Sequence, residues 1–249
     1  MPKFIVNISL LFTQHPIMDR FQLARDTGFQ GVEILTPYSF DAHELALAAT
    51  SANCPIHLIN APFGPEWGHG ADPNNRDTFR TEIGHAVNYA TILQAKHIHV
   101  LSGIKGDLKT LRENLIWATS TYPNQSFLIE PINTFDIPDY KLNNFDDAIE
   151  ILRAVNAPNL GLQFDTYHAS RMTKMSATCP TDVLRMSHVC LPWIKHIQVS
   201  GNPGRSEPDQ GVFDHVEFFR KLDVWGYDGM VGAEYKPTSG SFDWLAKAR

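Results

Sequence analysis

The sequence contains few cysteines, and they are not arranged in pairs. Cys54, Cys179 and Cys190 are the three cysteines among 249 residues, and none belongs to a C-x-x-C motif. A disulfide framework needs an even set of cysteines and a structural zinc site needs closely spaced ligands, so the sequence favours neither. This use of cysteine is typical of the reducing cytoplasm, where we expect the protein to be located.

The chain also lacks a long apolar run and an excess of positive charge. No segment approaches the roughly 20 apolar residues of a membrane-spanning helix. The segment Phe4–Phe12 contains Asn7 and Ser9 and leads to no small-residue cleavage site, so we interpret it as a strand and not as a signal peptide. The 21 Lys and Arg are outnumbered by 27 Asp and Glu, which gives a net charge of −6. Neither a membrane nor a nucleic acid is therefore an expected partner.

Several motifs of nucleotide and hydrolytic chemistry are missing. The sequence contains no G-x-x-x-x-G-K-[ST] phosphate loop, and the glycines of Gly64–Gly70 do not have the G-x-G-x-x-G spacing of a dinucleotide site. The H-E-x-x-H motif of zinc proteases and the G-x-S-x-G motif of α/β-hydrolases are also absent. These functions are therefore unsupported.

Short β-rich runs alternate with longer helical patterns along the whole sequence. The centres of the short runs are mostly Ile, Val, Leu and Phe, as expected for parallel strands that are covered on both faces. The predicted strands are Phe4–Ser9, Gly31–Leu35, Ile56–Ala61, His97–Leu101, Ser126–Glu130, Leu160–Asp165, His196–Ser200 and Met230–Tyr235.

Amphipathic segments with helical periodicity lie between these strands. They include Met18–Thr27, Asp77–Leu93, Asp146–Val155 and Asp214–Trp225. Such alternation predicts a parallel α/β fold, which is either a closed barrel or a doubly wound open sheet. A (β/α)8 TIM barrel usually has about 250 residues, and no linker divides this chain, so we expect a single domain over residues 1–249.

Acidic and amide residues interrupt the last four predicted strands at matching positions. Glu130, Asp165, Gln198 and Glu234 follow one another at separations of 35, 33 and 36 residues, close to one strand–helix unit per step. In a TIM barrel they would meet at the C-terminal ends of the strands, where active sites are built. Such an oxygen-rich set needs a cation and favours Mg²⁺ or Mn²⁺. Each residue taken alone could instead pair with a lysine or cap a helix.

Four further residues are candidates for substrate binding. His168 would contact the substrate or support the metal ligands, or else bond to the backbone. Arg205 follows the seventh strand in a turn-forming loop and suits bidentate capture of a carboxylate or phosphate, unless it is a solvated surface residue. Lys236 is a counter-ion or a substrate anchor. His57, inside the third strand, is either a satisfied core residue or a substrate contact in the barrel interior.

Around these residues the sequence resembles the hydroxypyruvate isomerase family, which belongs to the xylose isomerase-like TIM barrels. The resemblance covers most of the chain and rests on Gly28–Glu33, Leu128–Asn133, Phe164–His168, His196–Val199, Asn202–Arg205, Gly226–Gly229 and Gly232–Pro237. It implies a single TIM barrel and a divalent metal ion held by Glu130, Asp165, Gln198 and Glu234. It also implies that Glu130 and Glu234 form the acid/base pair, and that His168 and Arg205 lie near the substrate.

Two features depart from the family's pattern. The segment Arg171–Trp193 is unlike the usual link between the sixth and seventh strands, and the family often has an aliphatic residue in place of Thr166. A changed link would alter a wall of the active site, and with it the substrate.

The implied reaction moves a carbonyl group between adjacent carbons of a small hydroxy or oxo acid through an enediolate. The favoured pair is hydroxypyruvate and tartronate semialdehyde. A 2-oxotetronate isomerase and a sugar 3-epimerase are alternatives with the same motifs. The net charge and Gln198 weigh against a DNA-repair endonuclease of the same superfamily, and the intact ligand set weighs against a non-catalytic binding barrel. We expect the small hydroxy or oxo acid as the binding partner. The sequence leaves open whether the protein forms a homo-oligomer.

Overall fold

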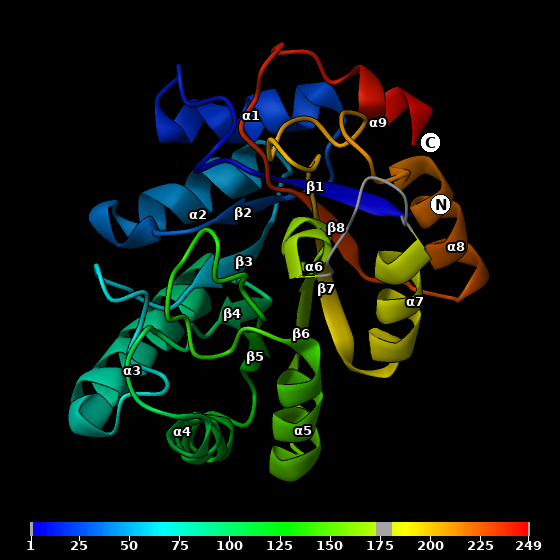
Figure 1. Ribbon diagram of the computed structural model, residues 1–249. Helices are drawn as coiled ribbons and strands as arrows, with labels where there is room; N and C mark the ends of the chain where they lie inside the picture. Colours follow the sequence, from blue (N-terminus) through cyan, green and yellow to red (C-terminus); the bar gives the residue numbers. More distant parts are fainter. Residues whose placement is uncertain (1, 173–180, 249) are drawn as a thin grey trace.

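Eight parallel strands close into a barrel in the order of the sequence (Figure 1). The computed structural model describes residues 2–172 and 181–248. The strands are β1 (Lys3–Asn7), β2 (Val32–Ile34), β3 (Ile56–Asn60), β4 (His97–His99), β5 (Ser126–Ile129), β6 (Leu160–Asp165), β7 (Ile194–Val199) and β8 (Met230–Ala233). Each predicted strand is present, and β1 pairs with both β2 and β8. The ring confirms the TIM barrel and excludes the open sheet.

Helices follow the strands and cover the outside of the barrel (Figure 1). The α-helices are α1 (Ile17–Thr27), α2 (Ala42–Ser51), α3 (Arg76–Leu93), α4 (Leu108–Thr121), α5 (Phe145–Val155), α6 (Thr166–Met172), α7 (Thr181–Cys190), α8 (His215–Val224) and α9 (Asp243–Lys247). Short 3-10 turns occur at Pro37–Ser39, Pro73–Asn75 and Leu191–Trp193. The four helical segments predicted from periodicity correspond to α1, α3, α5 and α8.

Local sequence explains where these helices begin and end. The side chain of Asn144 accepts a hydrogen bond from the backbone N–H of Asp147 at 2.8 Å and so caps the first turn of α5. Asp107 caps α4 in the same way through the N–H of Thr110. Gly28 ends α1 with a φ angle of 103°, a left-handed conformation that glycine adopts without strain, as its place after the predicted helix indicated.

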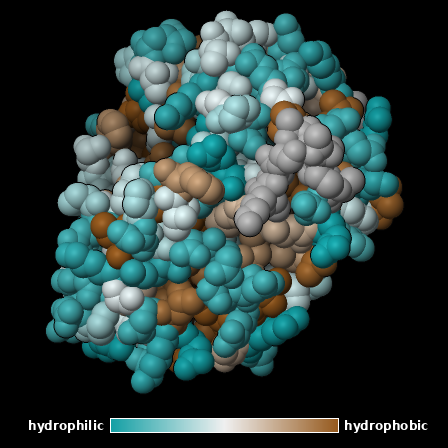
Figure 2. All heavy atoms as spheres, viewed as in Figure 1, coloured by the Kyte–Doolittle hydropathy of each residue, from teal (hydrophilic) through white to brown (hydrophobic). Residues whose placement is uncertain are grey.

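A hydrophobic core fills the layer between the strands and the helices. Near the chain ends, the ring of Phe4 in β1 contacts Phe219 of α8 and Trp244 of α9, with centroids 4.9 and 5.7 Å apart. These contacts hold the last helix against the first strand. Figure 2 shows hydrophilic residues over most of one face, with smaller hydrophobic patches between them. Within residues 2–172 and 181–248, no helix is both long enough and apolar enough to span a bilayer.

The inside of the barrel is more polar than the branched apolar filling that is usual for this fold. The imidazole rings of His57, His97 and His196 pack against one another, with the centroid of His57 lying 5.1 Å from that of His97 and 5.6 Å from that of His196. All three side chains are buried. Gln163 and Glu33 are buried as well and are hydrogen-bonded inside the barrel.

Candidate active site

The four residues predicted as metal ligands lie at one end of the barrel. Glu130 directly follows β5, Glu234 directly follows β8, Asp165 ends β6 and Gln198 lies in β7. Asp165 and Gln198 are in register across the two neighbouring strands. All four side chains are buried. The regular spacing in the sequence therefore corresponds to adjacent positions on the C-terminal rim.

A cavity of about 620 Å³ opens at this rim. Its polar lining includes Glu130, Gln163, His168, Gln198, Arg205, Glu234 and Lys236. Its apolar lining includes Phe63 and Trp67, whose rings stack with centroids 5.6 Å apart, and Phe135, which is 72% exposed. The cavity can therefore bind a polar molecule through one part of its surface and cover apolar atoms with another.

Two carboxylate oxygens at this site lack a hydrogen-bond partner although they are buried. They are Oε1 of Glu130 and Oδ2 of Asp165. Ligand atoms of Glu130, Asp165 and His168 all lie within 4.8 Å of one another. Buried oxygens normally have a partner, so this pair marks a position that suits a bound cation or a polar ligand.

Three buried carboxylates at the rim lie near a single positively charged side chain, that of Arg205. Burial raises the pKa of Glu130 well above its ordinary value, and the charges of Asp165 and Glu234 add to the effect. Burial likewise raises the pKa values of Asp165 and Glu234, which the guanidinium of Arg205 opposes. Three carboxylates thus share one guanidinium, and a further cation would favour their ionised forms.

The hydrogen bonds of His168 identify the nitrogen that carries its proton. Oδ1 of Asn133 accepts from the backbone N–H groups of Phe135 and Asp136, so the other end of this amide is the NH₂ group. That NH₂ group lies 2.7 Å from Nδ1 of His168, which must accept the bond. Nε2 therefore bears the hydrogen in the neutral ring, and it lies 3.7 Å from Oδ2 of Asp165. This arrangement suits a hydrogen-bond donor better than a metal ligand.

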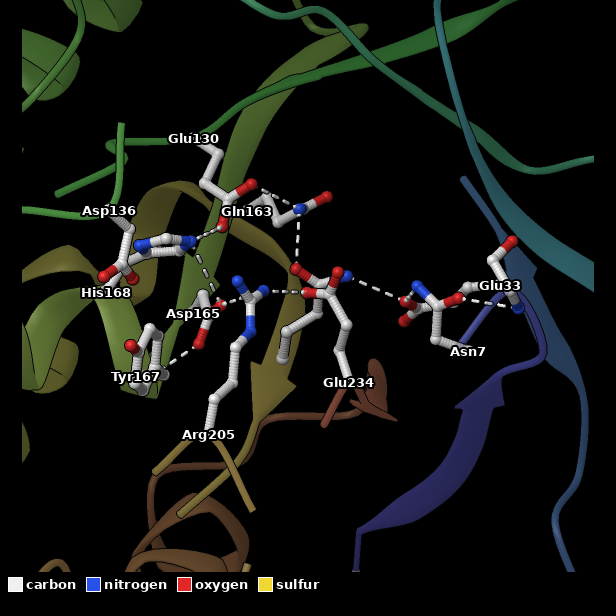
Figure 3. A network of polar contacts seen from close by, with 12 residues as sticks. Asn7, Glu33, Glu130, Asp136, Gln163, Asp165, Tyr167, His168, Arg205 and Glu234 are labelled. Atoms are coloured by element: carbon white, nitrogen blue, oxygen red, sulfur yellow. Dashed lines mark hydrogen bonds and ion pairs between the residues drawn. The ribbon is translucent and has the colours of Figure 1, made fainter. Parts of the chain in front are cut away.

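Arg205 lies among the carboxylates and is not a solvated surface residue. Its Nη2 donates to Oε2 of Glu234 at 3.0 Å and lies 3.6 Å from Oδ2 of Asp165 (Figure 3). The guanidinium also stacks over the ring of Tyr167 at 5.1 Å. Lys236 is exposed at the cavity lining, and its backbone N–H donates to the carbonyl oxygen of Arg205 at 2.7 Å.

The structure places His57 away from the other predicted substrate-binding residues. Its ring lies against His97 and His196 inside the barrel, and among the described residues it is not part of the cavity lining. Glu33 and Gln163 were not predicted as site residues, although both are polar residues inside predicted strands. Each polar side chain interrupts an apolar run, and this interruption is the feature of the sequence that could have identified the two residues.

The unusual segment Arg171–Trp193 is only partly described. Residues 173–180, which belong to the predicted change of the active-site wall, lie outside the described residues. At its start, the guanidinium of Arg171 lies 5.1 Å from the ring of Phe135, a residue of the cavity lining. Arg171 also lies 3.7 Å from a carboxylate oxygen of Asp136. The described beginning of the segment thus supports one wall of the cavity.

Known proteins resemble this chain over nearly its full length. A model of the xylose isomerase-like TIM barrel family matches residues 21–248. The 2-oxo-tetronate isomerase of Cupriavidus necator is 37% identical, with 98% of each chain covered. The hydroxypyruvate isomerase of Escherichia coli is 32% identical, also with 98% of each chain covered. A crystal structure of an AP endonuclease, family 2, from Brucella melitensis is 33% identical and has a TM-score of 0.92, with both chains covered completely.

Proposed function

Since the chain belongs to the xylose isomerase-like TIM barrel family and is an isomerase related to hydroxypyruvate and 2-oxo-tetronate isomerases, we propose that it moves a carbonyl group along a small hydroxy or oxo acid with the help of a divalent metal ion. The observation that carries this proposal is the group of buried carboxylates at the rim, two of whose oxygens have no hydrogen-bond partner. The small acid is the proposed binding partner.

The residues at the rim fit a hard divalent cation such as Mg²⁺ or Mn²⁺. Carboxylate and amide oxygens are the ligands that these ions prefer, and the set of Glu130, Asp165, Gln198 and Glu234 contains no sulfur. The oxygens of Glu130 and Asp165 that accept no hydrogen bond supply the position for such an ion. When bound, the ion would neutralise the carboxylates and stabilise negative charge on the oxygens of the substrate.

Glu130 and Glu234 are the proposed acid/base pair. In hydroxypyruvate the reaction removes a proton from C3 and returns one to C2, while the carbonyl moves from C2 to C3. Glu130 lies at the end of β5 and Glu234 at the end of β8, so their side chains reach the cavity from different parts of the rim. Oε2 of Glu130 accepts a hydrogen bond from Gln163 at 2.8 Å, and Oε1 has no hydrogen-bond partner.

His168 and Arg205 would hold the substrate in the orientation that the proton transfer needs. Nε2–H of His168 can donate to a substrate oxygen, because Asn133 occupies the other ring nitrogen. Arg205 has an Nε–H group without a partner, and its charge suits the carboxylate of the acid. Lys236, exposed at the cavity lining, would add a second positive charge for that group. Fixing the carboxylate determines which carbon meets the base.

A second candidate substrate is 2-oxo-tetronate, which is one carbon longer than hydroxypyruvate. Its isomerisation also moves a carbonyl from C2 to C3, so the same carboxylates can serve both acids. Two observations favour it: the cavity of about 620 Å³ leaves room for an additional hydroxymethyl group, and a relative with this activity is 37% identical. The ratio of kcat/KM for the two acids would decide between them.

The proposal is tested by following solvent deuterium at the carbon next to the carbonyl. We expect Glu130→Gln and Glu234→Gln each to lower turnover of both acids by a factor of about 100 or more, because general acid–base catalysis contributes at least that much. The folds should persist by circular dichroism. Glu113→Gln, which alters a partly exposed carboxylate paired with Arg76, is the matched control and should keep its activity. A chelator should abolish turnover and Mn²⁺ or Mg²⁺ should restore it. Full activity in both glutamine variants would contradict the proposal.

A further inference from the structure

Glu33 is a fully buried carboxylate that the proposed reaction does not use. It lies in β2, and its side chain reaches residues of β1 and β7 (Figure 3). Oε2 accepts a hydrogen bond from Nε2 of Gln198 at 2.7 Å and lies 3.4 Å from Nδ2 of Asn7. Oε1 lies 2.5 Å from Nε2 of His196. These contacts connect β2 to a proposed metal ligand on the far side of the barrel.

The contact with Glu33 determines which way the amide of Gln198 points. The group of Gln198 that faces Glu33 is the NH₂ group, which donates to Oε2 of the carboxylate. Oε1 of Gln198 is then directed to the other side. There it accepts from Nε2 of Gln163 at 2.7 Å, and this same nitrogen donates to Oε2 of Glu130 at 2.8 Å. Gln163 therefore donates to both Glu130 and Gln198, and Gln198 in turn donates to Glu33.

A glycine in β8 makes space for this carboxylate. A Cβ atom added at Gly232 would lie only 1.7 Å from Oε1 of Glu33 and 3.1 Å from Nε2 of His196. A glycine inside a strand weakens the strand but permits close approach of another group. The absence of a side chain at Gly232 therefore allows Glu33 to reach Gln198 across the barrel.

We propose that Glu33 is a positioning residue that holds the amide oxygen of Gln198 toward the metal site. The inference rests on the proposed function, because Gln198 matters as a ligand only if the rim binds a metal ion. Without the carboxylate, Gln198 could reverse its amide and present NH₂, which cannot bind a cation. Groups behind metal ligands commonly influence metal affinity in this manner.

The test measures Mn²⁺ binding to the purified protein by electron paramagnetic resonance, with no substrate present. Glu33→Gln leaves one acceptor oxygen for the three groups that contact the carboxylate, those of Gln198, His196 and Asn7. We expect it to weaken Mn²⁺ binding by roughly 10-fold to 100-fold. The double variant Glu33→Gln/Gln198→Glu reverses the polarity of the contact, since the introduced amide then donates to the introduced carboxylate. We expect the double variant to bind Mn²⁺ within about tenfold of the wild type.

The matched control is Glu82→Gln, which alters a carboxylate paired with His69 at 3.0 Å outside the cavity lining. It should leave Mn²⁺ affinity unchanged. Wild-type affinity in folded Glu33→Gln, or a double variant that binds Mn²⁺ no more tightly than Glu33→Gln, would overturn the inference. If Glu33→Gln does not fold, the double variant decides, because weak Mn²⁺ binding by it contradicts the proposed role. A wild type that binds no Mn²⁺ would overturn the metal site itself, and the two failures are thereby distinguished.

Discussion

Acidification should destabilise the protein partly through the buried histidine His57. Burial lowers the pKa of His57 to about 3, and the nearby His196 adds to the effect, whereas an unfolded histidine titrates near 6.5. A lowered folded pKa means that the unfolded chain binds more protons below pH 6.5. The contribution of His57 to the free energy of unfolding is therefore present above pH 6.5 and decreases as the pH falls toward 3.

The magnitude follows from these two pKa values. Between pH 7 and pH 5 the folded ring stays neutral, while the unfolded ring becomes almost fully protonated. Integration over this interval gives a loss of about 2 kcal/mol from this one residue. That is a substantial part of the roughly 5–15 kcal/mol by which a typical domain is stable.

Replacing the residue isolates its contribution from those of other titrating groups. His57→Phe should lose about 2 kcal/mol less than the wild type between pH 7 and pH 5, as measured by urea unfolding at both values. Its stability at pH 7 can differ for packing reasons, so the comparison concerns only the change with pH. His15→Gln, at an exposed histidine, is the control and should follow the wild type. Equal losses in the wild type and His57→Phe would refute the reasoning.

Three further predictions concern Glu207, Arg205 and Phe135. Burial would raise the pKa of Glu207, but hydrogen bonds from Thr238 and Ser239 lower it to about 2, so its contribution to stability should be present above pH 4.5 and decrease toward pH 2. Glu207→Gln should reduce the difference in urea stability between pH 5 and pH 3, and an undiminished difference would argue against the hydrogen bonds. Arg205→Lys keeps the charge but loses the planar fork, and we expect KM for the acid to rise about tenfold, measured by steady-state kinetics; an unchanged KM would remove the anchor role. Phe135→Ala, at a largely exposed residue of the cavity lining, should leave the melting temperature nearly unchanged but alter the kcat/KM ratio of hydroxypyruvate and 2-oxo-tetronate.

The barrel could be predicted from the sequence because its strands are apolar runs with regular spacing. The runs around Phe4, Ile56 and Phe127 are buried strands in the structure, as their composition indicated. Gly28 marked the end of a helix correctly. Closure of the barrel was not determined by alternation, since a doubly wound sheet alternates in the same way. The family resemblance and the length made the closed form the prediction, and the pairing of β1 with β8 confirms it.

The rim of the site was easier to predict than the interior of the barrel. Residues that end successive strands recur once per strand–helix unit, so Glu130 and Asp165 could be related by their spacing. Contacts across the barrel have no such period. Glu33 and His196, which are in contact, are separated by 163 residues in the sequence. The environment of His57 could not be predicted from the sequence either, because it depends on which histidines of other strands point into the barrel.

Two polar residues of the barrel interior, Glu33 and Gln163, are hydrogen-bonded to the rim. Polar groups inside a barrel are costly unless their donors and acceptors match, because little water is available to replace a missing partner. Glu33 and Gln163 satisfy this condition with respect to Gln198: one accepts from its nitrogen, and the other donates to its oxygen. A branched apolar residue in place of either would leave part of the amide unpaired. Glu33 and Gln163, two polar residues of the barrel interior, therefore match the two ends of the Gln198 amide at the rim.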